Sequence, residues 1–330
     1  MFRRTLLLTL TLSLALLATG CFSNNNVSLW PEIDDELTTM MVRKPLDDSE
    51  NRVLLLDIEG VISEYGNSSL FYDLEATTTL VRKKLEKAQR DERIKAVVLR
   101  VNSPGGTVTA SDIVYHEILK YKKTAKVPVV AAIMGVGASG GYYVSCSADK
   151  IMSHPTAING SIGVIMHSFG FAGLFEKIGM ESRVVKSGKL KDMGNPFNEM
   201  TDDERAVLQK IVDTSYERFL EVVAAARPQM TKEQIRAAAD GRIMTAAEAQ
   251  ELGLIDKLGD LEDAIDEAMT MANICDAGVI LYTTSKKPDQ NIFSATSAQA
   301  PEINLNPMGV DFETLVDLSR PRMYYMWMGY

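Results

Sequence analysis

Apolar runs of strand length alternate with segments of helical periodicity along the middle of the chain. Two strands are predicted at residues 53–58 (VLLLDI) and 95–101 (KAVVLRV), with a helix from about Thr77 to Arg90 between them. After a second helical segment, residues 127–134 (VPVVAAIM) form a continuous apolar run, typical of a strand buried on both faces. Strands joined by helices predict right-handed βαβ crossovers and a mostly parallel sheet in an α/β fold.

Helix start signals mark the second half of the chain. Thr201 precedes three acidic residues, so it is predicted to cap a helix whose first turn carries the negative charge that the helix dipole favours. This helix is expected to run to about Arg227, because Pro228 follows. Two further helix caps are predicted at Thr231 and Thr245. The sequence contains no internal repeat, which indicates a single structural unit.

Polar segments at both ends set the expected domain boundaries. Residues 21–51 are acidic with little periodicity, which indicates a flexible tether. Residues 285–330 mix Pro, Asn, Gln and Ser before an aromatic end that either docks on a partner or stays loose. Residues 52–284 between them form the expected folded domain.

Residues 1–20 have the pattern of a secretory signal. Arg3 and Arg4 precede an apolar run over residues 6–18, which is short for a membrane span, because a helix needs about 20 apolar residues to cross a bilayer. An uncleaved N-terminal anchor is the alternative. Removal of this segment takes away two positive charges, so the mature chain has a formal charge of -9 - 2 = -11.

The stretch LLATGC resembles the lipobox of bacterial lipoproteins, in which a lipidated Cys becomes the mature N-terminus. It departs from the commonest form because Ala18 stands three residues before Cys21, with Leu17 one place further out. The resemblance implies lipidation of Cys21. The protein is therefore expected to be extracytoplasmic and lipid-anchored in the bilayer, at the periplasmic face or elsewhere in the cell envelope.

Composition narrows the function classes. The formal charge of -9 and the pI of about 5.1 argue against a nucleic-acid surface, which needs clustered Lys and Arg. After Cys21 only Cys146 and Cys275 remain, so neither a disulfide framework nor a zinc cluster is predicted. Both are expected to be buried free thiols, with a bridge between them as the alternative. We expect no cofactor and no metal.

Candidate chemistry lies at glycine-rich corners. Residues 102–106 (NSPGG) follow a predicted strand, and they form either a plain tight turn or an oxyanion hole of backbone N–H groups. In residues 134–145, Ser139 follows an apolar strand and precedes Gly140 and Gly141 at a predicted helix start. Ser139 is either a helix cap or a nucleophile whose exposed hydroxyl lies at the positive end of the helix dipole.

A serine nucleophile needs a base, and the sequence offers two kinds. The three histidines have no evident orienting partner, so they are interpreted as structural: His116, His154 and His167. A lysine beside apolar groups loses its proton more easily and can act instead. Residues 184–200 carry three lysines after a short predicted β-branched strand, and the physical pattern does not choose among Lys186, Lys189 and Lys191.

The pieces NSPGG, ASGGYY, NGSIG and SGKLKD, in this order and spacing, resemble the motifs of the bacterial signal peptide peptidase A family, also called protease IV. The resemblance covers about residues 52–283. It implies the ClpP/crotonase fold, with parallel sheet units and flanking helices, and a serine endopeptidase that degrades signal peptides and other short apolar peptides. Such a protease would take peptides, and no nucleic acid, as partners.

The family pattern assigns roles residue by residue. It makes Ser139 the nucleophile and Lys191 the base, with the oxyanion hole at the N–H groups of Gly106 and Gly140. Ser161, in NGSIG, would hold the neutral lysine amine by a hydrogen bond, although a turn hydroxyl that satisfies its own backbone explains it equally well.

Two other functions stay open on the sequence alone. A crotonase-like acyl-CoA enzyme shares the fold and the oxyanion geometry, but its substrates are cytoplasmic. A non-catalytic lipoprotein that binds peptides is the other alternative. The longer members of the resembled family place nucleophile and base in different repeats, whereas this chain has one repeat. We therefore expect a cyclic homo-oligomer with shared active sites, in which Ser139 works with Lys191 of a neighbouring copy.

Overall fold

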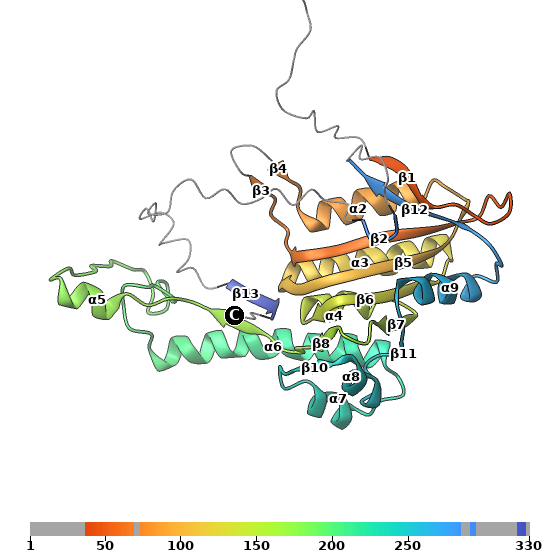
Figure 1. Cartoon of the computed structure of the whole chain (residues 1–330). Helices are drawn as coiled ribbons and strands as arrows, with labels where there is room; N and C mark the ends of the chain where they lie inside the picture. Colours follow the sequence, from red (N-terminus) through yellow and green to blue (C-terminus); the bar gives the residue numbers. More distant parts are fainter. Residues whose placement is uncertain (1–36, 69–72, 285–290, 295–321, 328–330) are drawn as a thin grey trace, which may run out of the picture. The chain divides into compact units, whose positions relative to one another are not determined.

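A mostly parallel sheet organises the chain (Figure 1). The computed structural model describes residues 37–68, 73–284, 291–294 and 322–327. Along the sheet, neighbouring strands pair in parallel in the order β12, β2, β5, β6, β7, β11, and β1 adds an antiparallel edge on β12. The bounds of these strands are β1 Thr38–Arg43, β2 Arg52–Ile62, β5 Ile94–Thr107, β6 Val129–Ala138, β7 Lys150–Ser153, β11 Lys257–Leu258 and β12 Gly278–Thr283.

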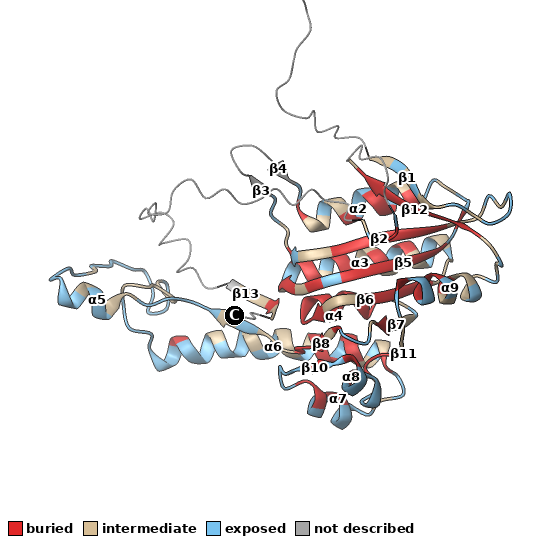
Figure 2. Cartoon of the chain, in the orientation of Figure 1, coloured by how far each residue is buried: buried red, intermediate tan, exposed pale blue. Residues whose placement is uncertain are grey.

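Helices cover both faces of the sheet, as the continuous apolar runs predict. Leu54 of β2 and Leu99 of β5 belong to an apolar cluster shared with α2 (Thr77–Ala88) and α3 (Val108–Ala125). Val53 and Val98 belong to a second cluster, shared with α9 (Leu261–Met271) on the opposite face. Successive strand residues point to opposite faces of the sheet, so a strand covered by helices on both faces must be apolar at every position. Figure 2 shows these central strands as the buried part of the molecule.

The predicted helix caps are present. α6 (Asp202–Ala226), α7 (Lys232–Ala238) and α8 (Ala246–Glu251) begin after Thr201, Thr231 and Thr245, and each of these side chains accepts a hydrogen bond from the third helical N–H. The remaining elements are β3 Asn67–Ser68, β4 Asp73–Leu74, α4 Gly140–Ser145, β8 Ile158–Gly160, β9 Ile165–His167, α5 Ala172–Lys177, β10 Ile243–Thr245 and β13 Arg322–Met326.

The sheet reaches into both segments that the sequence assigns to the tails. β1 lies within the predicted tether of residues 21–51, and β13 lies within the predicted tail of residues 285–330. Each is held by backbone pairing with a strand far away in the sequence, which local composition does not reveal. The predicted signal segment 1–20 and Cys21 lie outside the described residues.

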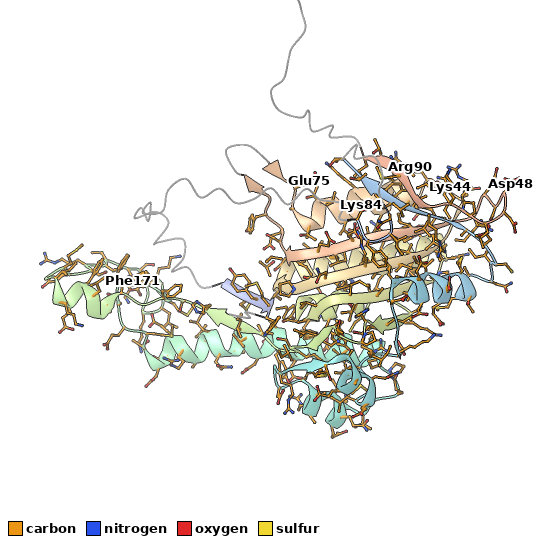
Figure 3. All side chains as sticks on the ribbon, in the orientation of Figure 1. Lys44, Asp48, Glu75, Lys84, Arg90 and Phe171 are labelled. Atoms are coloured by element: carbon orange, nitrogen blue, oxygen red, sulfur yellow. The ribbon has the colours of Figure 1, made fainter. Side chains whose placement is uncertain are left out.

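A buried ion pair on the α9 face of the sheet fixes another part of the tail. Arg100 of β5 donates to Asp57 of β2 at 2.6 Å, and their side chains are 6% and 4% exposed. Its guanidinium also donates to the backbone carbonyls of Ile292 and Ser294. Lys84 on α2 is buried nearby (Figure 3), and burial lowers its pKa while the negative charge of Asp57 acts in the opposite direction. These contacts attach residues 291–294 to the sheet.

No helix in the described part of the chain is long and apolar enough to cross a membrane.

Candidate active site

Ser139 occupies a strained corner between β6 and α4. Its backbone has φ 51° and ψ -116°, a conformation that L-residues rarely adopt and that costs about 1–3 kcal/mol. The corner is fixed on both sides, because the Ser139 N–H donates to the Gly160 carbonyl at 2.8 Å and the Tyr143 N–H donates to the Ser139 carbonyl at 2.8 Å. A serine on a sharp strand-to-helix turn is the geometry of a nucleophile in several hydrolases.

The Ser139 side chain does not cap the helix. Within the described residues its hydroxyl makes no hydrogen bond to the helix that follows. The residue is 1% exposed, so the sequence prediction of an exposed hydroxyl is wrong. The reason is that β13 pairs with the end of β5 beside this corner, and the Tyr325 carbonyl oxygen lies 2.9 Å from the point where a Cβ of Gly140 would stand.

The structure brings the two predicted glycine corners together. A Cβ on Gly105 would stand 2.6 Å from the backbone nitrogen of Gly140, and a Cβ on Gly106 would stand 1.8 Å from the Ile62 carbonyl oxygen. Only glycine fits such contacts. The NSPGG segment is not a turn, because β5 continues through it to Thr107 with Gly105 at φ 103°. Gly140 is the first residue of α4, so its N–H has no partner within the helix.

Ser161 lies at the same edge as Ser139. The residues before them, Ala138 and Gly160, are register partners in the parallel pair of β6 and β8. Ser161 is buried, has φ 50°, and its N–H donates to the Arg242 carbonyl at 2.7 Å. Its hydroxyl has no hydrogen bond among the described residues, so the sequence alternative of a self-satisfied turn hydroxyl is not observed there.

Lys191 lies on a protruding segment, which we call the arm and define as residues 163–203. None of these residues is buried, and Figure 1 shows α5 and the loop after it away from α4. The arm includes the predicted β-branched strand near Val185, but no strand forms there and Val185 is fully exposed. Within the described chain, β9 is the part of the arm that pairs with another strand, and no strand pairs with the residues around Val185. The structure therefore does not bring Lys191 to Ser139 within one chain.

The three lysines of the arm differ in their partners. Lys186 pairs with Asp192 at 2.5 Å, and Lys189 pairs with Asp203. The hydrogen bond to Asp203 raises the pKa of Lys189, which favours the ammonium form and disfavours a role as base. Lys191 makes no ion pair with any described residue. Of these three lysines, therefore, Lys191 is the one that is not paired with a carboxylate of the described chain.

None of the three histidines contacts Ser139 among the described residues. His116 contacts Asp112 and Arg218, and His154 contacts Thr156, so neither has Ser139 as a partner among the described residues. The ring of His167 packs on its neighbour Phe169.

The two cysteines after Cys21 are both free. Cys146 is buried and Cys275 is exposed, so the predicted burial of both thiols is wrong for Cys275, which lies after the end of α9.

An aromatic cluster at the start of α4 was not predicted from the sequence. Tyr325 of β13 is fully buried against Tyr143 of α4 and Phe219 of α6. The aromatic end of the chain was the one available signal. Its place in the fold depends on pairing with Gly106, more than 200 positions away.

A strained serine at a strand-to-helix corner of a parallel sheet is an arrangement found in serine hydrolases. Comparison with known proteins gives the family. Residues 121–275 match the model of peptidase family S49. The putative signal peptide peptidase SppA of Enterococcus faecium is 38% identical over 234 residues, which cover 71% of this chain and 67% of that protein.

Protease 4 of Haemophilus influenzae is 32% identical over 242 residues, 73% of this chain and 38% of that longer protein. Among solved structures, the 1510-N membrane-bound stomatin-specific protease aligns with a TM-score of 0.42 and 16% identity, over 66% of this chain and 84% of that one. The chain belongs to peptidase family S49 and is a serine peptidase of the SppA type. The family predicted from the four motifs is confirmed, and so is an α/β fold with parallel sheet units and flanking helices.

Proposed function

We propose that the protein is an endopeptidase that uses Ser139 and Lys191 as a dyad and degrades signal peptides and other short apolar peptides at a membrane surface. The observation that carries this proposal is the Ser139 corner. A buried serine with a strained backbone lies beside the glycines of β5 and α4, whose missing side chains leave room for a peptide backbone.

The proposed mechanism assigns one role to each group. Neutral Lys191 takes the proton of the Ser139 hydroxyl, which attacks the peptide carbonyl. The N–H groups of Gly106 and Gly140 stabilise the oxyanion. Lys191 then gives its proton to the leaving amine, and water hydrolyses the acyl-enzyme. Ser161, at the same sheet edge as Ser139, orients the neutral amine by a hydrogen bond.

The position of Lys191 supports a site shared between copies. A lysine acts as a base only when its ammonium form is desolvated, and Lys191 is exposed in the single chain. The arm that carries it exposes a series of large apolar side chains, which a neighbouring copy would cover. They are Ile165, Phe169, Leu174, Ile178, Met180, Val184, Val185, Leu190 and Met200. A head-to-tail contact of this kind closes into a ring in which each subunit gives Ser139 to one site and Lys191 to the next.

Mixing two inactive variants tests the shared site. Ser139→Ala and Lys191→Ala are co-refolded in equal amounts, and about one quarter of the interfaces should then pair an intact Ser139 with an intact Lys191. Peptide hydrolysis should return to about that fraction. The matched control mixes Ser139→Ala with the double variant, which cannot form any intact pair. If the first mixture stays as inactive as the control despite proven subunit exchange, the shared site is wrong.

A fluorophosphonate probe tests the nucleophile separately. Such probes label activated serines, so labelling of the wild-type protein should disappear in Ser139→Ala. Equal labelling of both proteins would reject Ser139. A non-catalytic scaffold would not be labelled at all.

Attachment to the membrane is proposed through Cys21, which lies outside the described residues. Lipidated Cys21 would hold the peptidase where apolar fragments leave the bilayer. Cells fed with labelled fatty acid should incorporate it into the wild-type chain and not into Cys21→Ser. Equal incorporation in both would refute the lipid anchor.

A further inference from the structure

Two helices begin at the proposed oxyanion hole. α3 begins directly after Gly106 and its cap Thr107, and α4 begins at Gly140. The two helix starts are in contact, because a Cβ on Gly140 would stand 2.4 Å from the hydroxyl oxygen of Ser111 in α3. The separation of the Gly106 and Gly140 N–H groups therefore depends on how α3 and α4 are held against each other.

A side-chain hydrogen bond joins these two helices close to their starts. The Tyr143 hydroxyl on α4 donates to the carboxylate of Asp112 on α3. Tyr143 is three residues after Gly140, and Asp112 is six residues after Gly106. The Tyr143 N–H also donates to the carbonyl of Ser139 at 2.8 Å. The bond between Tyr143 and Asp112 therefore connects the segments that carry the two proposed oxyanion donors.

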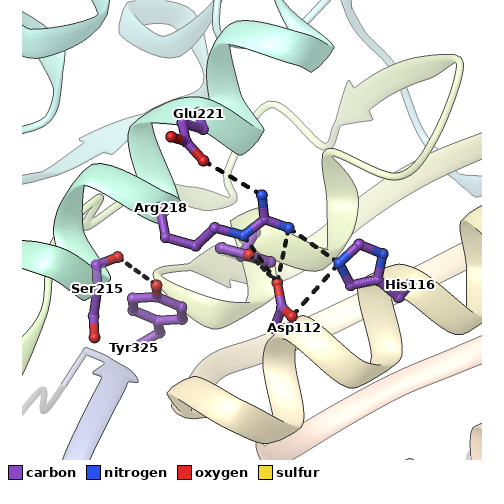
Figure 4. Close-up of polar contacts among 7 residues, drawn as sticks. Asp112, His116, Ser215, Arg218, Glu221 and Tyr325 are labelled. Atoms are coloured by element: carbon purple, nitrogen blue, oxygen red, sulfur yellow. Dashed lines mark hydrogen bonds and ion pairs between the residues drawn. The ribbon is translucent and has the colours of Figure 1, made fainter.

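A third helix holds the Asp112 carboxylate in place (Figure 4). Arg218 of α6 donates to the same oxygen that accepts from Tyr143, at 3.2 Å and 3.4 Å. His116 lies 3.5 Å from the other carboxylate oxygen, and Glu221 lies 3.5 Å from Arg218. Hydrogen bonds to an ionised carboxylate are stronger than those between neutral groups. Asp112 is therefore fixed from α6 as well as from α4.

Tyr143 is well suited to a positioning role. It is fully buried, and its ring packs edge-on against Tyr115 of α3 at 5.4 Å and Phe219 of α6 at 5.0 Å. Burial raises the pKa of Tyr143 and its hydrogen bond to Asp112 raises it further, so the phenol keeps its proton and remains a donor. Replacement of Tyr143 by Phe removes the hydroxyl and leaves the ring to pack as before.

We propose that Asp112 is a positioning residue of the proposed active site, and that its hydrogen bond with Tyr143 fixes the distance between the Gly106 and Gly140 N–H groups. This inference rests on the proposed function, because it takes these two groups as the oxyanion hole. Asp112 acts through Tyr143 and the two helices. It lies outside the four family motifs, whereas Tyr143 is the last residue of ASGGYY.

Displaced oxyanion donors have a definite kinetic effect. They stabilise the transition state more than the bound substrate, so their displacement lowers kcat and leaves KM nearly unchanged. Complete removal of one donor costs about 100-fold to 1,000-fold in kcat, and displacement costs less. For Tyr143→Phe we therefore expect kcat to fall by about 10-fold to 100-fold, with KM changed by less than about twofold.

Tyr142→Phe is the matched control. Tyr142 is the neighbouring residue on α4, it is also fully buried, and its hydroxyl donates to the Leu254 carbonyl at 2.7 Å. The two substitutions remove the same atom and one hydrogen bond each. Leu254 lies between α8 and β11, a segment to which the proposed mechanism assigns no group. Tyr142→Phe should therefore lose a similar amount of stability and keep its kcat.

The assay measures kcat and KM of the full-length protein on a fluorogenic peptide, per active site counted by complete fluorophosphonate labelling. A peptide boronate gives the second readout, because its tetrahedral adduct with a serine places an oxygen in the oxyanion hole. Its affinity should fall in Tyr143→Phe by about the same factor as kcat. A variant that is only partly unfolded would lose active sites, while its remaining sites would keep both values.

Variants of Asp112 test whether the two side chains act together. Asp112→Ala should lose as much kcat as Tyr143→Phe, and the double variant should lose no more, because both changes remove one bond. Asp112→Asn keeps an acceptor oxygen, so it should recover part of the kcat lost in Asp112→Ala. An additive loss in the double variant would contradict the proposal. If Asp112→Ala does not fold, the comparison of Tyr143→Phe with Tyr142→Phe decides.

The proposal is overturned if Tyr143→Phe keeps the kcat and the boronate affinity of the wild type, or if it loses no more than Tyr142→Phe. Either result leaves the proposed function intact, since the wild type still hydrolyses peptides. If the wild type itself shows neither hydrolysis nor boronate binding that depends on Ser139, the proposed function fails instead.

Discussion

Replacement of Lys191 by Met tests the proposed base against two neighbours on the same loop. Met keeps the length of the side chain and removes the amine. Lys191 is exposed and makes no ion pair with the described residues, so its loss should change the free energy of unfolding by no more than about 0.5 kcal/mol. Removal of a general base should lower kcat/KM by about 100-fold to 10,000-fold.

Lys186→Met and Lys189→Met are matched controls from the same loop. The structure gives each of these lysines an ion pair, with side-chain exposures of 36% and 12% for Lys186 and Asp192, and 76% and 59% for Lys189 and Asp203. Exposed pairs contribute about 0.2–1 kcal/mol to stability. Such a loss leaves a protein of ordinary stability almost fully folded, so activity should change less than about twofold.

The assay measures kcat/KM on a fluorogenic peptide for all three variants, with thermal unfolding as the check on folding. The reasoning predicts a gap of at least about 50-fold between Lys191→Met and either control, from the ranges for a general base and for exposed ion pairs. Comparable losses in all three variants, with unfolding temperatures unchanged, would refute Lys191 as the base.

Three further outcomes follow from the fold. Iodoacetamide at pH 8 should modify Cys275 and spare Cys146, since Cys146 is buried and burial raises its pKa to about 12; equal modification in peptide mapping would contradict this burial. Because the pKa of Cys146 is raised from 9.0, its contribution to the free energy of unfolding is full below pH 9 and is lost as the pH rises towards 12. The urea midpoint of the wild type should therefore fall between these pH values, and it should fall less in Cys146→Ala. Thr201→Ala removes the first hydrogen bond of α6 and should lower the free energy of unfolding by about 0.5–2 kcal/mol in urea titrations; an unchanged midpoint would show that the cap is redundant.

Local pattern was sufficient to predict the central layers of the fold. Strands such as residues 127–134 were recognised because a strand covered on both faces must be apolar at every position. The caps Thr201 and Thr231 were recognised because their hydrogen bonds are made within one helical turn. Both kinds of signal depend only on residues close together in the sequence.

Long-range pairing accounts for most of what sequence reasoning missed. The NSPGG segment has the composition of a turn, yet it stays extended because β2 and β13 pair with it. Twenty-seven residues separate β13 from the nearest described segment before it, so no local rule places it beside Gly106. Val185 has strand propensity but no strand of the described chain to pair with. The sequence pattern did not distinguish the three lysines of the arm as candidate bases, whereas the structure distinguishes them because two of them form ion pairs.

The backbone conformation of Ser139 also bears on how such a site can change over evolutionary time. Glycine adopts a φ of 51° without the strain that serine carries there, so Ser139→Gly should raise thermal stability while it removes the proposed nucleophile. Selection for stability alone would therefore act against the serine at this position. A lineage that no longer needed hydrolysis would have an immediate route to a more stable, inactive descendant with the same fold. Peptide-binding proteins without activity could arise from this fold by that single substitution.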